Sequence, residues 1–248
     1  MKQLVAVASF GLALLAWQLA SSVTPNAAVF LPSPLAVLHA LQDLFIEQGF
    51  LTDILDSIYR VSVGFLLAIA VGYPIGLLIG TSARWAAWLE PLNEFARYLP
   101  VAALIPLVIV WFGIDDLQKI VIIFIGTVFQ FVPMVSSSVR RVPVNLLELG
   151  TLMGFRGCSR VIRVAIPSTA PEIYDHARIC LGWAWSYVIV AELVAANTGV
   201  GHVIIQAQRF IQTADVMAGI VTIGIIGLLF DAAMRLPKAM LFPWSRER

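Results

Sequence analysis

The sequence predicts an all-α integral membrane protein of about six transmembrane helices. Hydrophobic residues make up 60% of the chain and charged residues only 12%, against roughly 25% charged residues in soluble domains. A helix needs about 20 apolar residues to cross a hydrocarbon core about 30 Å thick. The 248 residues are therefore enough for six spans joined by modest loops, with nothing large appended. A water-soluble fold is not expected.

The N-terminal region combines an apolar segment with a capped helix. Residues 4–23 are apolar throughout and follow Lys2; they are either a signal peptide or a first span, and their length favours a retained helix. Ser33 followed by Pro34 is typical of an N-cap and the first helical position. The helix that follows, to about Gln48, looks amphipathic and interfacial.

Five further spans are expected. The second, residues 58–80, has glycines on one helical face, which predicts close packing against other helices. The third, residues 92–112, contains Pro100 and Pro106, which remove backbone donors and predict a kink. The remaining spans are residues 120–139, 179–196 and 216–236. The glycines of the second span are Gly64, Gly72, Gly76 and Gly80.

No linker divides the chain, so residues 1–248 are expected to form a single transmembrane domain. Residues 1–57 would hold the first span and the interfacial helix, and residues 58–236 the core bundle. A polar loop over residues 140–176 interrupts this bundle, and residues 237–248 form a basic tail.

Lysine and arginine are distributed unevenly between the predicted loops. Because short cytoplasmic loops retain these residues, the loops that nearly lack them are expected to face outward. The long polar loop and both termini are then cytoplasmic. The residues that indicate the cytoplasmic side are Arg84, Arg140, Arg141, Arg156, Arg160, Arg163, Arg235, Lys238, Arg246 and Arg248.

The polar loop has the most informative pattern in the chain. Four apolar residues recur there at helical spacing, Gly154 and Gly157 permit a sharp turn, and a second apolar set follows among arginines before Pro167. This pattern predicts two short helices and a proline stop, with an apolar side toward the membrane domain and a basic side outward. The four apolar residues are Leu146, Leu149, Leu152 and Met153.

This loop resembles the Glu-Ala-Ala signature of permease subunits of binding-protein-dependent ATP-binding-cassette (ABC) importers. The signature has an acidic residue, a glycine six residues later and a proline thirteen residues beyond that, matched by Glu148, Gly154 and Pro167. Leu149 and Gly150 stand where two small residues usually follow the acid, a mild departure. The resemblance implies insertion into a cleft on a separate ATPase subunit. The residues expected to make this contact are Glu148, Gly150, Leu152, Met153, Gly154, Phe155, Arg156, Arg160 and Pro167.

The resemblance extends from about residue 30 to the C-terminus and indicates the nitrate, sulfonate, taurine and bicarbonate branch of these importers. It implies the type I importer fold and a multi-pass protein of the bacterial inner membrane that carries a small anion. The implied partners are a second permease copy, expected to form a homodimer, two copies of the ATPase, and an external solute-binding protein. The strings that carry it are Leu31-Pro-Ser-Pro, Tyr59-Arg-Val-Ser-Val-Gly-Phe, Trp111-Phe-Gly, Ala184-Trp-Ser and Leu241-Phe-Pro-Trp.

A few polar residues within the predicted spans are candidates for the translocation pathway. Glu192 is costly in a membrane and so is a functional candidate, although packing against a serine or tryptophan is an equal alternative. Arg97 either screens an anion or pairs with Glu94, and helical spacing favours the pairing. The remaining candidates, which could contact a polar substrate or simply bridge helices, are Gln130, Tyr187 and Gln206.

Other classes of function fit the sequence less well. The net charge of +1 argues against a nucleic-acid partner, and Cys158 and Cys180 lack the spacing and histidine companions of a metal site. No catalytic set and no Gly-x-x-x-x-Gly-Lys-Ser/Thr loop is found, so no cofactor is expected on this chain, and ATP and Mg²⁺ would be bound by the ATPase. A stand-alone secondary transporter or channel is the main rival, but the nearly charge-free spans disfavour it.

Overall fold

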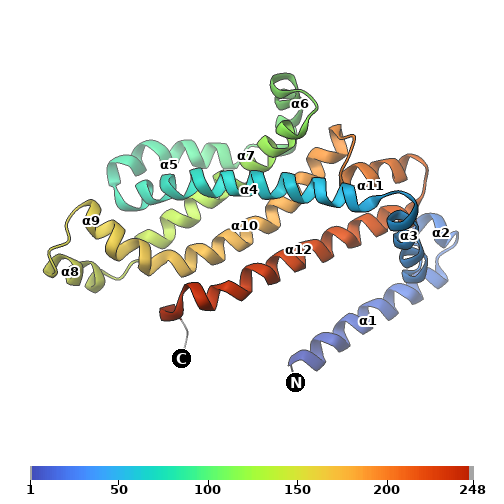
Figure 1. Cartoon of the computed structure of the whole chain (residues 1–248), viewed down its shortest axis with the longest axis horizontal. Helices are drawn as coiled ribbons and strands as arrows, with labels where there is room; N and C mark the ends of the chain where they lie inside the picture. Colours follow the sequence, from blue (N-terminus) through green and yellow to red (C-terminus); the bar gives the residue numbers. More distant parts are fainter. Residues whose placement is uncertain (1, 246–248) are drawn as a thin grey trace. The chain divides into compact units, whose positions relative to one another are not determined.

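The computed structural model describes residues 2–245, and all regular structure in this range is helical (Figure 1). The all-α prediction is thus confirmed, while the tail residues Arg246 and Arg248 lie outside the described range. The elements are α1 (Lys2–Val23), α2 (Ala27–Phe30), α3 (Pro34–Glu47), α4 (Phe50–Thr81), α5 (Ala83–Arg97), α6 (Val101–Phe112), α7 (Asp116–Arg140), α8 (Val144–Leu152), α9 (Cys158–Arg160), the π-helical turn η1 (Val161–Ala165), α10 (Ile166–Ala195), α11 (Val200–Arg209), α12 (Thr213–Leu241) and the 3-10 turn η2 (Pro243–Ser245).

The chain forms two compact units. The first consists of Met1–Ile58 and Glu192–Ile226, and the second of Tyr59–Ala191 and Gly227–Arg248. Helices α4, α10 and α12 each contribute residues to both units. The predicted single domain with boundaries at residues 57 and 236 stays a prediction.

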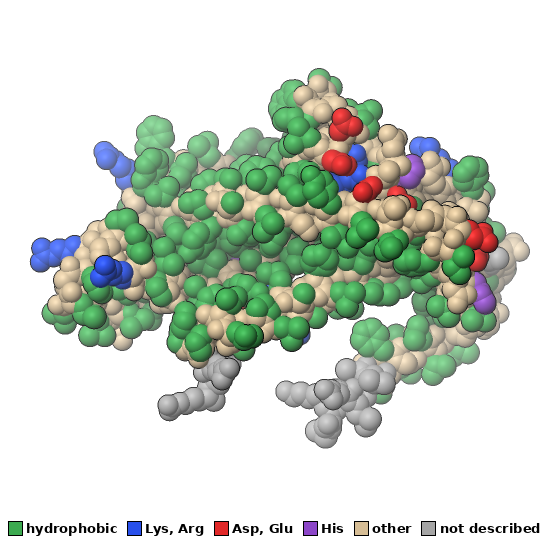
Figure 2. Space-filling model, in the orientation of Figure 1, with side chains coloured by type: hydrophobic (Ala, Val, Ile, Leu, Met, Phe, Trp, Pro, Cys, Tyr) green, Lys and Arg blue, Asp and Glu red, His purple; other side chains and the backbone are tan. Residues whose placement is uncertain are grey.

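Four helices are long and apolar enough to cross a membrane: α4, α7, the continuous helical segment Cys158–Ala195, and α12. A fifth span results if α5 and α6 are counted together. The described apolar part of α1, Ala8–Val23, is shorter. The structure therefore supports a multi-pass membrane protein, and α1 as a sixth span stays a prediction. Figure 2 shows hydrophobic side chains along α4 and α12 and basic side chains at the α8–α9 end of the second unit.

The kink predicted for the span over residues 92–112 takes the form of a sharp break. The chain forms two helices there, α5 and α6, that meet at 96°. Pro100 stands at the break, where it is the N-cap residue of α6, while Pro106 lies inside α6. Pro100 disfavours helical geometry in the residue before it, so the turn ends at Leu99 and a new helix starts in a new direction.

Pro167 does not stop a helix, contrary to the prediction, and the helix starts before the predicted residue 179. Pro167 is the second residue of α10, which continues from η1 without a break. In η1 the bonding pattern lengthens, and the Ile166 N–H donates to the carbonyl of Val161. A π turn of this kind accommodates the missing donor and the ring of a proline without ending the helix.

In the first unit, α3 begins as predicted. The Ser33 side chain accepts the Ala36 N–H at 3.2 Å, and Pro34 is the first residue of the helix. The α1 helix is fastened to the turn before α3, because Trp17 Nε1 donates to the Pro32 carbonyl at 3.0 Å and Ser21 Oγ to the Leu31 carbonyl at 2.8 Å. The residues of α3 buried on one face are Val37, Ala40 and Leu44.

In the second unit, the glycine face of α4 packs directly on α7, as predicted. A Cβ atom added at Gly76 would lie 2.5 Å from Val135 Cβ, and one added at Gly64 would lie 2.8 Å from Ile123 Cβ. Real Cβ atoms do not approach this closely, so only glycine permits the two helix axes to lie at this distance. Small residues at such contacts give membrane helices their van der Waals packing.

Candidate functional site

The polar loop folds as α8, a glycine turn and α9, and it forms one end of the second unit (Figure 1). α8 ends in a Schellman motif. Gly154 has φ +87°, the Phe155 N–H donates to the Gly150 carbonyl at 2.9 Å, and the Gly154 N–H donates to the Thr151 carbonyl at 3.0 Å. Gly157, with φ +54°, then redirects the chain into α9. The predicted glycine turn is confirmed.

The loop is held against the start of α10 by contacts at small and basic residues. A Cβ atom at Gly150 would lie 2.7 Å from Val164 Cγ2, so α8 can approach η1 only because this position is glycine. The Arg163 guanidinium lies over the Phe155 ring at 4.9 Å, a cation–π contact. These contacts fix the position of α8 relative to the long helix that follows.

The apolar side of α8 points into the surroundings rather than toward the helices of its unit. Leu152 is 84% exposed and Met153 71%, and Leu149 is also exposed. The predicted orientation, apolar toward the membrane domain, is therefore wrong for α8, whose contact with η1 is made by Gly150. In the second apolar set, Val161 and Val164 are half-buried. Glu148, Arg156, Arg160 and Pro167 are exposed as well, and Phe155 is half-buried. We call the exposed surface formed by Leu149, Leu152 and Met153 the α8 tip.

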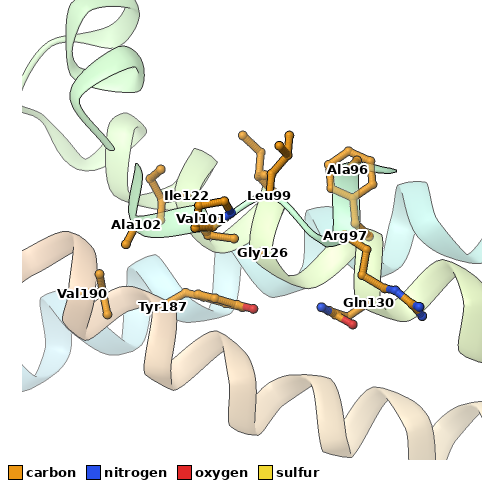
Figure 3. A pocket seen from close by; sticks show the side chains of 13 residues that line it. Ala96, Arg97, Leu99, Val101, Ala102, Ile122, Gly126, Gln130, Tyr187 and Val190 are labelled. Atoms are coloured by element: carbon orange, nitrogen blue, oxygen red, sulfur yellow. The ribbon is translucent and has the colours of Figure 1, made fainter. Parts of the chain in front are cut away.

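A cavity of about 320 Å³ lies at the break between α5 and α6, with α7 and α10 forming its other walls (Figure 3). It brings together three of the five pathway candidates, Arg97, Gln130 and Tyr187. Tyr187 and Gln130 extend toward each other from α10 and α7, and Arg97 lies beside Gln130 (Figure 3). The rest of the lining is apolar apart from Gly126. We call this space the α5–α6 cavity.

Arg97 is the charged residue of this cavity. Its guanidinium lies over the Tyr98 ring at 5.2 Å, and Nη2 donates to the Tyr98 hydroxyl at 3.3 Å. The pairing with Glu94 that the spacing favoured is not found within residues 2–245, where the salt bridges of arginine involve other residues. Arg97 thus presents its charge to the α5–α6 cavity with a neutral partner.

Tyr187 is positioned by a glycine. A Cβ atom at Gly126 of α7 would lie 2.5 Å from Cδ2 and Cε2 of the Tyr187 ring. The ring therefore rests on the bare backbone of α7 at the edge of the cavity. Any larger residue at position 126 would require the ring to move.

The structure gives Glu192 the helix-packing role that was one of its two predicted alternatives. It is fully buried and accepts hydrogen bonds from Ser57 Oγ at 2.8 Å and from the Gly201 N–H at 2.8 Å. The Ser57 hydroxyl in turn accepts the Val200 N–H at 3.0 Å. The carboxylate and hydroxyl thus cap the first N–H groups of α11.

Gln206 lines a second cavity, of about 680 Å³, within the first unit. Asp53 and His202 also line this cavity, and Asp53 accepts the Gly199 N–H at 2.7 Å. Asp53 and Ser57 were missed by the sequence analysis. Their positions four residues apart place both on one face of α4, but the same stretch also holds Thr52, Asp56 and Arg60, so the sequence alone did not single them out.

Comparison with known proteins identifies the class. Residues 72–244 match the family described as binding-protein-dependent transport system inner membrane component, so the chain belongs to this family. It is the permease of an ABC importer, as the loop signature predicted.

Individual relatives agree with this assignment. The chain is 33% identical to a protein named as an aliphatic sulfonates transport permease of Bacillus subtilis (strain 168), over 93% of this chain and 84% of the relative. It is 29% identical to the taurine transport system permease of Escherichia coli (strain K12), over 98% of this chain and 90% of the relative. Among solved structures, the inward-facing MetNI methionine ABC transporter has a similar fold, with a TM-score of 0.64 at 19% identity, covering 75% of this chain and 94% of the other. The predicted type I importer fold is confirmed.

Proposed function

We propose that this chain transmits ATP-driven movement through the α8 tip and is itself non-catalytic. Two copies would form the translocation pathway, each bound on its cytoplasmic side to one copy of a separate ATPase that holds ATP and Mg²⁺. An external solute-binding protein would deliver the substrate. Both termini and the α8 tip would then face the cytoplasm, in agreement with the arginine-rich loop.

The observation that carries this proposal is the exposed apolar α8 tip on a helix that packs tightly against η1. Leu149, Leu152 and Met153 form an exposed apolar surface that lies outside the helices able to cross a membrane. Apolar surface exposed to water is characteristic of interfaces. Gly150 of α8 contacts Val164 of η1 directly, and η1 continues into α10, so a displacement of α8 would also displace α10. Exposed Arg156 and Arg160 add positive charge around the tip.

Coupling then follows from a two-state mechanism. Closure of the ATPases on ATP would draw the two α8 tips together. α10 would move with each tip because Gly150 of α8 packs on Val164 of η1, and η1 continues into α10 without a break. ATP binds one state of the assembly better than the other, and hydrolysis removes that preference. The permease would act as the mechanical gate in this cycle.

The substrate we propose is a small anion. Two of the relatives are named for the transport of aliphatic sulfonates and taurine, and the α5–α6 cavity has a cationic side chain in its wall. The external binding protein would supply most of the discrimination between such anions.

Co-purification of the tagged chain with the ATPase tests the coupling proposal. Leu152→Asp places a charge in the centre of the apolar surface, and Gly154→Pro disrupts the positive-φ turn; both should lose the ATPase while eluting as a folded membrane protein. Val144→Asp, exposed on the first turn of the same helix, is the matched control and should retain it. Transport that persists after deletion of the ATPase would contradict the proposal and favour a stand-alone transporter.

A further inference from the structure

The α5–α6 cavity has a positive charge that the protein leaves without a carboxylate. Arg97 lines it, and within the described residues its polar contact is the neutral Tyr98 hydroxyl. Two other arginines that pack between helices of this unit do have a carboxylate partner: Arg60 bonds Asp116 at 2.7 Å, and Arg140 bonds Glu90 at 2.9 Å. The Arg97 guanidinium, with several N–H donors in a planar fork, keeps most of them available for a bound anion.

The broken helix adds a second source of positive potential. The first two residues of α6, Val101 and Ala102, line the same cavity, and Pro100 provides no side-chain acceptor for their N–H groups. The N-terminus of a helix has a partial positive charge and free N–H donors. Discontinuous membrane helices use such ends to bind anionic groups of substrates.

The remaining walls of the α5–α6 cavity favour a ligand that has an apolar part next to its charged group. Apart from Arg97, Gln130 and Tyr187, the cavity is formed by small or aliphatic side chains and one phenylalanine, including Ile122 and Ile125. An inorganic anion would lose its hydration there and gain few polar contacts in return. A short hydrocarbon chain would instead gain by leaving water.

We propose that the α5–α6 cavity is a substrate site on the permease itself for a short-chain aliphatic monoanion. Arg97 and the start of α6 hold the anionic head, and the aliphatic body lies among the apolar walls. Gly126 determines the space available to the aliphatic body, because the Tyr187 ring that borders this space packs against Gly126. This inference rests on the proposed transport function and goes beyond it by assigning an organic class of anion and the residues that select it.

The test measures direct binding to the purified permease–ATPase complex without its binding protein. Calorimetric titration should show binding of ethanesulfonate and weaker or no binding of two matched probes: ethanol, which lacks the charge, and nitrate, which lacks the aliphatic body. Equal binding of nitrate and ethanesulfonate, or no binding of ethanesulfonate, would overturn the proposal.

Variants then assign the residues. Arg97→Gln should weaken ethanesulfonate binding at least tenfold, the factor that corresponds to about 1.4 kcal/mol, while Arg84→Gln, an arginine of the same unit outside this cavity, should not. Gly126→Ala should displace the Tyr187 ring and change the ratio of methanesulfonate to butanesulfonate affinity. Unchanged affinity in Arg97→Gln would refute the assignment.

These outcomes are separable from the coupling proposal. Each variant is first shown to co-purify with the ATPase, which establishes that the complex is assembled. Loss of anion binding in a cavity variant that retains the ATPase concerns the cavity alone. Loss of the ATPase in Leu152→Asp concerns the α8 tip alone.

Discussion

At the scale of single residues, Arg97 and Glu192 show two ways of placing a charge among apolar helices. Glu192 is buried and satisfied, since Ser57 and the Gly201 N–H donate to it. Arg97 is only half-buried and faces a cavity. The sequence predicted that both residues matter but could not assign their roles, because the donors to Glu192 come from residues more than one hundred positions away or from backbone groups.

Removing the Glu192 carboxylate should destabilise the protein. Glu192→Ala leaves buried donors without their acceptor, so the free energy of unfolding should fall by about 2 kcal/mol. Denaturant titration in detergent, followed by circular dichroism, measures this. Glu192→Gln, which keeps one acceptor oxygen, should lose less, and Glu94→Ala, at an exposed position, should stay close to wild type. Wild-type stability of Glu192→Ala would show that the carboxylate does not hold α11.

At the scale of elements, the glycines were better guides to the structure than the prolines of the predicted spans and of the polar loop. Pro100 separates two helices, Pro106 sits inside α6, and Pro167 lies within a continuous helix. A proline removes one donor in each case, and whether the helix ends depends on how the neighbouring turns rearrange, as η1 does before Pro167. The glycine face of α4 was predictable because helical spacing and small size are local properties of the sequence.

The α4–α7 contact should be sensitive to added volume. Gly76→Ala would place a Cβ atom 2.5 Å from Val135 Cβ and 2.9 Å from the Val132 carbonyl oxygen, so the helices must separate at a cost of about 1–3 kcal/mol. Gly182→Ala, where nothing lies within 4 Å, is the matched control and should be neutral or slightly stabilising. The midpoints of thermal unfolding in detergent compare the two. Equal midpoints would show that the contact does not limit stability.

At the scale of the whole molecule, composition predicted a helical membrane protein, and the resemblance of the polar loop to a known signature predicted the family and its fold. The family signature uses local spacing from Glu148 to Pro167, and the all-α fold follows from hydropathy alone. What escaped prediction depends on tertiary context: which side of α8 is exposed, the 96° break, and the grouping of Arg97, Gln130 and Tyr187 around one cavity. The cytoplasmic placement of the loop stays a prediction from charge.

The two cysteines offer a direct test of that placement. Cys158, in the loop, is exposed, whereas Cys180 is buried. A membrane-impermeant maleimide should therefore label Cys158 in inside-out vesicles but not in intact spheroplasts. The variant Cys158→Ser should abolish labelling in inside-out vesicles and stay unlabelled in spheroplasts. Labelling of Cys158 in spheroplasts would reverse the orientation of the whole chain.

The exposed α8 tip also has a consequence for how such a complex is made in the cell. A chain synthesised before its ATPase presents Leu149, Leu152 and Met153 to water, and uncovered apolar surface of this kind promotes association with other proteins and recognition by quality-control proteases. The same surface that would contact the ATPase in the assembled transporter would expose the unassembled permease to degradation. Balanced synthesis of the two proteins would then be a requirement for accumulation of the permease, separate from any requirement for transport.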